Sequence, residues 1–170
     1  MKTRHAIVDT ALGELTVVAS GEAVVGLYFP QHWYMPAEEA LGPRVEIRDD
    51  ALLAATAAQL VEYLAGDRTS FDVPTATDGD PFQERVWAML REIPFGETTT
   101  YGTLAERLGN KALAQSVGQA VGHNPISIIV ACHRVVGSDG RLTGFAGGLE
   151  RKRRLLELEE SEAAKTARLF

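Results

Sequence analysis

The stretch TTTYGTLAERLGNKALAQSVGQAVG, residues 98–122, decides the fold of the second half of the chain. Thr100 can cap a helix that ends at Gly109, and Asn110 can cap a second helix after a turn of about two residues. Gly118 lies inside the second helix, which indicates that another group approaches the backbone closely there. Two short helices joined this tightly predict a helix-turn-helix, a motif that also occurs in proteins that never bind DNA.

Helical signals continue on both sides of this pair. Upstream, Asp80 and Pro81 begin a helix that ends before Pro94 and carries an apolar stripe at helical spacing. Downstream, the run 126–130 predicts a buried extended segment, and SDGRLTGFAGG predicts a glycine-rich loop or hairpin. The last helix, LERKRRLLELEE, is expected to turn its leucines inward. These are Leu149, Leu155, Leu156 and Leu158.

The first 80 residues have the pattern of a small α/β unit. HAIVD, LTVVA and VVGLYF are short β-branched runs separated by turn residues, which predicts an antiparallel meander. ALLAATAAQLVEYLAGD predicts a helix capped by Asp50 and followed by Gly66, and FDVPTATDGD predicts a short strand and a linker. We therefore predict an α/β N-terminal domain over residues 1–78, a small antiparallel sheet plus a helix. A mostly α C-terminal domain with the helix-turn-helix should follow over residues 79–170.

The composition is that of a soluble globular protein, with 45% hydrophobic and 24% charged residues in a chain of 170. There is no apolar run long enough to span a membrane, and MKTRHAIVDT lacks the apolar stretch of a secretion signal. A cytoplasmic location is therefore expected, with no membrane partner. A single cysteine excludes an internal disulfide and a zinc site built from several cysteines.

Positive charge is concentrated in the second half of the chain, although the net charge is -6. Residues 1–80 carry five Lys and Arg against thirteen Asp and Glu, whereas residues 107–154 carry eight against two. This asymmetry is typical of a nucleic-acid-binding face, because phosphates are bound mainly through Lys and Arg. The run Arg151–Arg154 also fits an ordinary solvated helix face, so charge alone leaves both interpretations open.

Cys132, the only cysteine, comes directly after the apolar run and directly before His133. A cysteine at the end of an apolar segment is usually core filler. His133 favours the other interpretation, since a nucleophilic cysteine needs a base or a cation to supply thiolate. Neighbouring side chains of an extended segment point to opposite faces, so contact between the two would need a bend or a water. These residues alone leave nucleophile and filler open.

Four motifs, in order and spacing, resemble the O6-alkylguanine-DNA alkyltransferases, also called methylated-DNA–protein-cysteine methyltransferases. They are PFQERVWAMLREIPFGETTTYGTLAERLG, VGHNP, ACHRVV and GFAGGLERKRRLLELE, and they cover nearly all of residues 81–159. The first 80 residues match the family's small N-terminal domain only in general pattern. The resemblance implies irreversible transfer of an alkyl group from O6 of guanine, or O4 of thymine, in flipped-out DNA to Cys132. It implies one turnover, with no cofactor and no metal.

The resemblance also assigns roles to residues. Cys132 matches the acceptor, His133 the base that acts through a water, and Glu159 the carboxylate that orients this histidine. Tyr101 matches the proton donor to the departing guanine, and Asn124 matches the residue that fixes the turn before the active site. The substrate pocket would be formed by Val130, Ala131, Ser127, Phe145 and Ala146. The second helix would enter the minor groove of double-stranded DNA, with contacts from Gln115, Ser116, Tyr101, Thr100, Lys111, Ala114, Gly118 and Arg134.

The chain departs from the family pattern at several positions. Gln115 stands where the family has an arginine that fills the gap left by the flipped base, and Ala131 replaces a proline. Phe145 replaces a tyrosine, and Ser127 a pocket proline of some members. These departures bear on base flipping and on the size of the alkyl group.

Other functions remain open at this stage. A non-catalytic alkylated-DNA-binding protein would lack the acceptor cysteine, and a sequence-specific regulator would need a further domain. A variant specialised for bulky lesions is the third alternative. We expect a monomer and leave cooperative assembly on DNA open.

Overall fold

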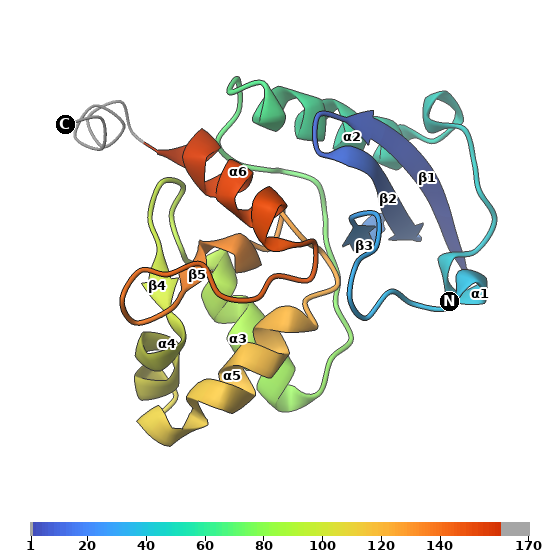
Figure 1. Ribbon diagram of the computed structural model, residues 1–170. Helices are drawn as coiled ribbons and strands as arrows, with labels where there is room; N and C mark the ends of the chain where they lie inside the picture. The colour runs from blue at the N-terminus through green and yellow to red at the C-terminus, as the bar shows by residue number, and fades with distance from the viewer. Residues whose placement is uncertain (1, 161–170) are drawn as a thin grey trace.

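The computed structural model describes residues 2–160 of the protein (Figure 1). Its first half contains a three-stranded antiparallel sheet in the order β1-β2-β3. The bounds are β1 (Thr3–Thr10), β2 (Gly13–Ser20) and β3 (Ala23–Tyr28). Val18 and Ala19 mark a register shift in the pairing of β2 with β3. The β-branched residues that predicted the meander therefore form it, because they fit a pleated and half-buried surface.

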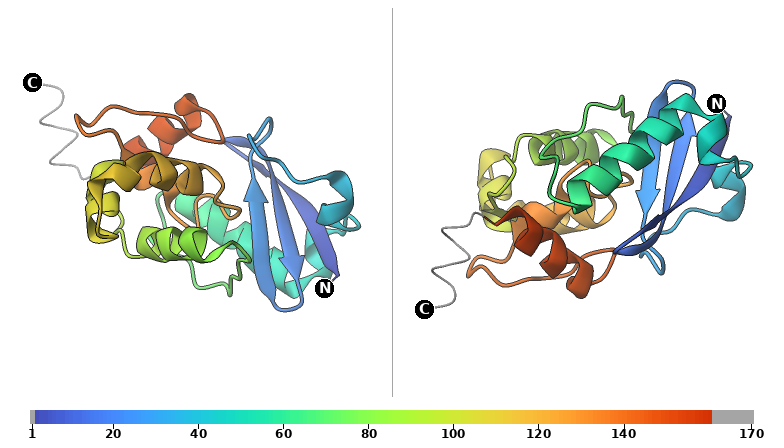
Figure 2. Two further views of the ribbon diagram at one scale, coloured as in Figure 1. Left: turned by 90° about the horizontal axis from the view of Figure 1, so that it is seen from below. Right: turned by 90° about the horizontal axis from the view of Figure 1, so that it is seen from above.

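Helix α2 (Ala51–Leu64) covers one face of this sheet (Figures 1 and 2). It begins at the predicted cap, where Asp50 accepts a hydrogen bond from the Leu53 N–H at 3.1 Å. Asp50 also pairs with Arg4 of β1, so the helix start is tied to the sheet. Two short helical turns, α1 (Glu38–Leu41) and the 3-10 turn η1 (Ile47–Asp49), precede it.

The second half is mostly helical, as predicted. Its first helix, α3, begins with a capping box between Asp80 and Gln83, and the Trp87 indole N–H donates to the Ala120 carbonyl at 2.8 Å. The helix-turn-helix is formed by α4, the 3-10 turn η2 and α5, and α4 is capped by Thr100. The elements are α3 (Pro81–Arg91), β4 (Thr99–Thr100), α4 (Tyr101–Arg107), η2 (Lys111–Leu113), α5 (Ala114–Gly122), the 3-10 turn η3 (Cys132–Arg134), β5 (Val135–Val136) and α6 (Leu149–Glu159). The predicted fold class is confirmed.

One apolar core runs through both halves, and backbone hydrogen bonds join them. The Leu27 N–H of β3 donates to the Pro125 carbonyl at 2.8 Å, and the Ser127 N–H donates back to Leu27 at 3.3 Å. From α6, Arg151 donates to the Leu12 carbonyl at 2.8 Å. The sheet therefore lies directly against the segment that leads to Cys132. No helix within residues 2–160 is long and apolar enough to cross a membrane.

Three local predictions are wrong. Residues 126–130 are not an extended segment: Ile126 makes one bridge to β3, and the chain then turns through Ile128 at φ 71°. The strand predicted within FDVPTATDGD is reduced to one bridge between Thr75 and Val24. Leu149 is 47% exposed rather than inward, because the buried face of α6 is formed by Lys152, Leu155 and Glu159.

The segment that follows β3 packs directly on the glycine-rich segment, and this contact generates a prediction. A Cβ atom added at Gly147 would lie 2.3 Å from Phe29 Cδ2 and 2.8 Å from Phe29 Cγ, and Phe29 is itself buried. We expect Gly147→Ala to lower the free energy of unfolding by about 1–3 kcal/mol, the usual cost of overpacking.

The matched control is Gly102→Ala in α4, where the nearest atom to an added Cβ is 3.8 Å away. This change should be neutral or should stabilise by up to about 1 kcal/mol, the difference in helix propensity. Urea titrations followed by circular dichroism measure both values. Equal effects of the two changes would contradict the close packing of Phe29 on Gly147.

Candidate functional site

Cys132 is the first residue of η3 and is 4% exposed. Burial raises the pKa of its thiol, and hydrogen bonding from Asn124, the charge of Lys152 and hydrogen bonding from Ser127 oppose this only in part. The thiol is therefore protonated at neutral pH and needs a base before it can act as a nucleophile. Because residues 132–134 form a 3-10 turn, the strict alternation of an extended strand does not separate the Cys132 and His133 side chains.

The carboxylate of Glu159 lies at the centre of a buried network. Its Oε2 is 2.9 Å from His133 Nε2, and Arg134 donates to both of its oxygens at 2.8 Å. The Tyr63 hydroxyl of α2 donates to the same carboxylate. Burial alone would raise the pKa of Glu159, but the hydrogen bonds from His133 and Arg134 outweigh it and lower the pKa to about 2. Glu159 is therefore ionised at neutral pH.

His133 is fully buried and is held through one ring nitrogen only. Burial lowers its pKa although Glu159 opposes the shift, so the ring is neutral at pH 7. A carboxylate at Nε2 favours the tautomer with the proton on Nε2, which leaves the lone pair on Nδ1. Within residues 2–160, Nδ1 is buried and has no hydrogen-bond partner. The ring is thus oriented as a base whose acceptor atom is unused.

The Arg134 side chain lies largely inside the protein. It was predicted to contact DNA, but it is 9% exposed, and its guanidinium bonds to Glu159 and, at 2.6 Å, to the Ile93 carbonyl. Two other basic residues of 107–154 are also used internally: Lys152 is buried, and Arg151, which is half-buried, donates to the Leu12 carbonyl of the first half. Counting charges along the sequence therefore overestimates the positive charge that this half exposes.

Tyr101 begins α4, and its ring faces α5 at Gly118. A Cβ at Gly118 would lie 3.7 Å from the Tyr101 ring, which is an ordinary van der Waals contact, so the close approach predicted at this glycine is not found. The Thr143 hydroxyl donates to the Tyr101 oxygen at 3.2 Å, which leaves the phenol proton available for another acceptor. Burial raises the pKa of Tyr101, so the phenol keeps its proton at neutral pH.

A cavity of about 520 Å³ opens beside this ring, between α5 and the segment 143–146. Of the predicted residues, Tyr101, Ala114, Gln115, Gly118, Phe145 and Ala146 line it. Gln115, Ser116 and Lys111 are exposed at the start of the second helix, and Thr100 is half-buried. Val130, Ala131, Ser127, Asn124 and Cys132 are buried and do not line the cavity.

The Asn124 side chain is hydrogen-bonded to the backbone of the turn that precedes Cys132. Its side-chain amide donates to the Val130 carbonyl at 2.8 Å, and its side-chain oxygen accepts from the Ile126 N–H at 3.0 Å. It therefore closes the turn that presents Cys132. Sequence reasoning missed two other residues, Trp33 and Tyr34, which line the cavity from the first half. Their signal is a run of large apolar residues, HWYM, outside any predicted helix or strand.

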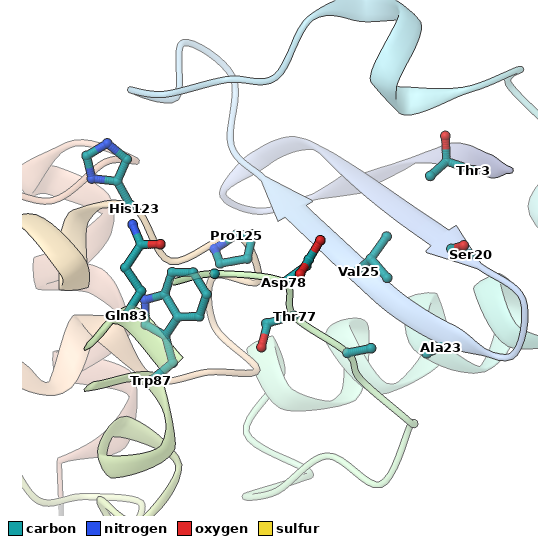
Figure 3. A pocket seen from close by; sticks show the side chains of 12 residues that line it. Thr3, Ser20, Ala23, Val25, Thr77, Asp78, Gln83, Trp87, His123 and Pro125 are labelled. Carbon is teal, nitrogen blue, oxygen red and sulfur yellow. The ribbon is translucent and has the colours of Figure 1, made fainter. Parts of the chain in front are cut away.

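A second cleft, of about 660 Å³, lies between the sheet and the start of α3 (Figure 3). Val25, Trp87 and Pro125 give it a largely apolar lining, and Asp78 is its only carboxylate. It contains neither Cys132 nor His133. Within residues 2–160, no group of three or more His, Cys, Asp and Glu side chains could hold a metal ion. The Cys132 region therefore remains the candidate reaction site.

Comparison with known proteins gives matches over nearly the whole chain. The family model for the ribonuclease-like domain of 6-O-methylguanine DNA methyltransferase matches residues 3–77, and the model for its DNA binding domain matches residues 81–161. The methylated-DNA--protein-cysteine methyltransferase of Mycobacterium tuberculosis is 43% identical over 96% of each chain. The one from Methanosarcina acetivorans is 39% identical over 92% of this chain and 98% of its own. The crystal structure of Mycobacterium tuberculosis OGT in complex with DNA is similar with a TM-score of 0.82, at 39% identity over 92% of each chain.

The buried carboxylate predicts a pH dependence of stability. In the folded protein the pKa of Glu159 is about 2, below its ordinary value of 4.5, so the unfolded chain binds more protons between these values. The stabilisation is thus complete above about pH 4.5 and is lost as the pH falls toward 2. Glu159→Gln should lower the free energy of unfolding at pH 7 by about 3–5 kcal/mol, because it leaves Arg134 without its charged partner. This difference from wild type should shrink by roughly 3 kcal/mol on acidification.

Urea titrations between about pH 7 and pH 3 should show roughly 2 of these 3 kcal/mol, because the unfolded chain binds the proton over this range while the folded carboxylate stays mostly ionised. The control is Glu157→Gln, a half-exposed neighbour on α6, for which we expect a change of less than about 0.5 kcal/mol. A difference between Glu159→Gln and wild type that stays constant with pH would show that the carboxylate does not carry the charge argued here.

Proposed function

The chain belongs to the 6-O-methylguanine DNA methyltransferase family, and on that premise we propose that Cys132 is the residue that accepts the alkyl group. The activity is direct DNA repair by alkyl transfer, that of a methylated-DNA--protein-cysteine methyltransferase. The observation that carries the assignment is the cysteine count: a transfer to a protein cysteine has only Cys132 available in this chain. Its neighbour His133, oriented as a base by Glu159, supports it.

The proposed reaction is a single displacement at the alkyl carbon. The sulfur of Cys132 forms a bond to that carbon while the bond between the carbon and guanine O6 breaks. The thiol gives up one proton, and the departing guanine gains one, so the proton count balances. The product is a thioether, which no group in the site can cleave. Each molecule should therefore act once, without a cofactor.

We propose that His133 takes the thiol proton through a water bound at Nδ1. A buried ring nitrogen without a protein partner normally bonds to water, and Nδ1 is such an atom. Glu159 fixes the tautomer that leaves Nδ1 as the acceptor, and it stabilises the imidazolium that forms. Arg134 and Tyr63 hold Glu159 in place. In this proposal Arg134 supports the base and does not contact DNA.

Tyr101 is proposed as the donor of the proton that the guanine gains. Its hydroxyl accepts from Thr143, so its own proton can be directed to a ring nitrogen of the base. Asn124 positions the loop that carries Cys132. Backbone groups near Val130 and Ala131, with Ser127, Phe145 and Ala146, are proposed to surround the base.

The proposed substrate is double-stranded DNA that contains O6-alkylguanine, or O4-alkylthymine, with the damaged base flipped out of the stack. Helix α5 would enter the minor groove, with Gln115, Ser116, Lys111, Ala114, Gly118 and Thr100 near the DNA backbone and the gap left by the flipped base.

We propose a monomer that works in the cytoplasm, where a reducing environment keeps the thiol free. The boundary between the two domains is proposed near residue 78, just before the cap of α3.

The experiment that tests this function follows the mass of the intact protein after incubation with duplex DNA containing O6-methylguanine. Wild type should gain one methyl group on Cys132 and plateau at one transfer per molecule, whereas Cys132→Ala should gain none and still bind DNA. His133→Ala should slow the transfer by roughly 100- to 10,000-fold, the usual contribution of a general base. Methylation of Cys132→Ala, or a wild-type rate in His133→Ala, would contradict the mechanism.

A second prediction concerns Gln115, which is exposed at the start of α5 and lines the cavity. Arginine here would fill the gap left by the flipped base better than glutamine and would sit favourably in the negative potential of the groove. A gain of about 1.4 kcal/mol corresponds to a tenfold larger flipped population. We therefore expect Gln115→Arg to speed transfer from duplex DNA about tenfold and to leave transfer from the free O6-alkylguanine base unchanged.

The matched control is Gln119→Arg, which adds the same charge one turn further along α5 and beside the same cavity. It should affect the duplex rate much less. The measurement is the ratio of the duplex rate to the free-base rate for each variant. If both variants raise this ratio equally, general charge attraction and not gap filling would explain the effect.

A further inference from the structure

Three consecutive large apolar side chains are exposed in the loop between β3 and α1. Trp33 is 50% exposed, Tyr34 56% and Met35 41%, and among residues 2–160 only two other large hydrophobic side chains are exposed. A group of this kind on the surface of a folded protein usually marks an interaction site. The family's catalytic residues all lie in the other half of the chain, so this loop has no part in the mechanism described above.

Two contacts dock the loop onto the glycine-rich segment. The Trp33 N–H donates to the Ala146 carbonyl at 2.9 Å. The Trp33 ring also lies so close to Gly144 that a Cβ there would be 3.1 Å from Cη2 and 3.3 Å from Cζ3. Before Trp33, the buried His32 accepts from the Phe29 N–H at 3.2 Å, and its ring stacks on Phe29. The indole is therefore held in one place rather than free to move with the loop.

Trp33 and Tyr34 border the same cavity as Tyr101, Gln115 and Phe145. The two rings differ in whether a face is free to stack on a ligand. Tyr34 already stacks on His123, with ring centroids 3.7 Å apart and an interplanar angle of 17°. Trp33 makes no ring stack with another described side chain, and half of its surface is open. Of the two, Trp33 is the one that can offer an aromatic face to a planar molecule inside the cavity.

We propose that Trp33 is a specificity-determining residue of the lesion pocket: its indole packs against the flipped, alkylated base and limits the size of the alkyl group. This inference rests on the proposed function, since it requires that the base enters this cavity. Indole faces stack on nucleobases without regard to sequence, which suits a base recognised by its modification. The first half of the chain thereby supplies one wall of a pocket whose reacting groups all belong to the second half.

Removal of the indole should lower the rate for a small alkyl group more than the rate for a large one. Loss of one base–aromatic contact corresponds to a rate loss of roughly 5- to 150-fold. For O6-methylguanine we expect Trp33→Ala to lose about tenfold within that range, because the base is held less firmly. For O6-benzylguanine the wider cavity offsets this loss. The ratio of the benzyl rate to the methyl rate should therefore rise about fivefold or more.

The experiment measures second-order rates of Cys132 alkylation with four substrates, O6-methylguanine and O6-benzylguanine, each as the free base and in duplex DNA. Trp33→Ala should raise the benzyl-to-methyl ratio in both settings, and Trp33→Phe should restore most of the wild-type ratio. Met35→Ala is the matched control, because Met35 is exposed in the same loop but does not line the cavity. It should leave all four rates unchanged.

Two outcomes would overturn the inference while the proposed function stands. The first is an unchanged benzyl-to-methyl ratio in Trp33→Ala although wild type is alkylated on Cys132. The second is a loss confined to the duplex substrates, which would place Trp33 against the DNA backbone instead of the base. Failure of wild type to be alkylated by any substrate would instead refute the proposed function, and this inference with it.

Discussion

The structure depends on one buried charge, the carboxylate of Glu159. Removing a carboxylate from water costs several kcal/mol unless partners replace the lost hydration. Here the partners come from two places in the chain: Arg134 and His133 from η3, and Tyr63 from the helix that covers the sheet. The network can therefore form only when α2, η3 and α6 are all in place. The same contact that stabilises the fold fixes the tautomer of His133, so the imidazole proposed as the base is oriented by folding itself.

Helix α6 carries a second buried charged residue, Lys152. Lys152 donates to the Val135 carbonyl at 2.6 Å and to the Thr143 carbonyl at 3.0 Å, and it lies seven residues before Glu159 on the same helix face. Burial lowers its pKa to about 8. It joins the strand that follows Cys132 to the segment that carries Phe145, and its charge favours the thiolate. Two ionised residues thus occupy positions where a helix of this kind usually places leucines.

Local signals in the sequence predicted most of the fold. The caps at Asp50, Asp80 and Thr100 stand where they were expected, because capping depends only on residues a few positions away. The error at Leu149 and the burial of Arg134 have one cause, since both follow from charged side chains that are buried on or against α6, which no periodicity reveals. The wall formed by Trp33 was missed for a related reason. Its partners Gly144 and Ala146 are more than a hundred residues away in the sequence, and only folding brings them together.

The Cys132 thiol and the His133 imidazole are both uncharged in the free protein, whereas a reactive cysteine is usually a thiolate. Burial raises the pKa of Cys132 and lowers that of His133, so thiol and imidazole both lack charge at pH 7. For Cys132 as the proposed acceptor, which its reaction consumes, this is an advantage, because the thiolate is also the form that oxidants and stray electrophiles attack. Cys132 does not line the cavity, whereas Tyr101 does. In the structure the Tyr101 ring is therefore accessible from the cavity, whereas the Cys132 side chain is buried. In the proposed mechanism the thiolate forms only when His133 takes the thiol proton, so burial keeps the sulfur in its less reactive form until that step.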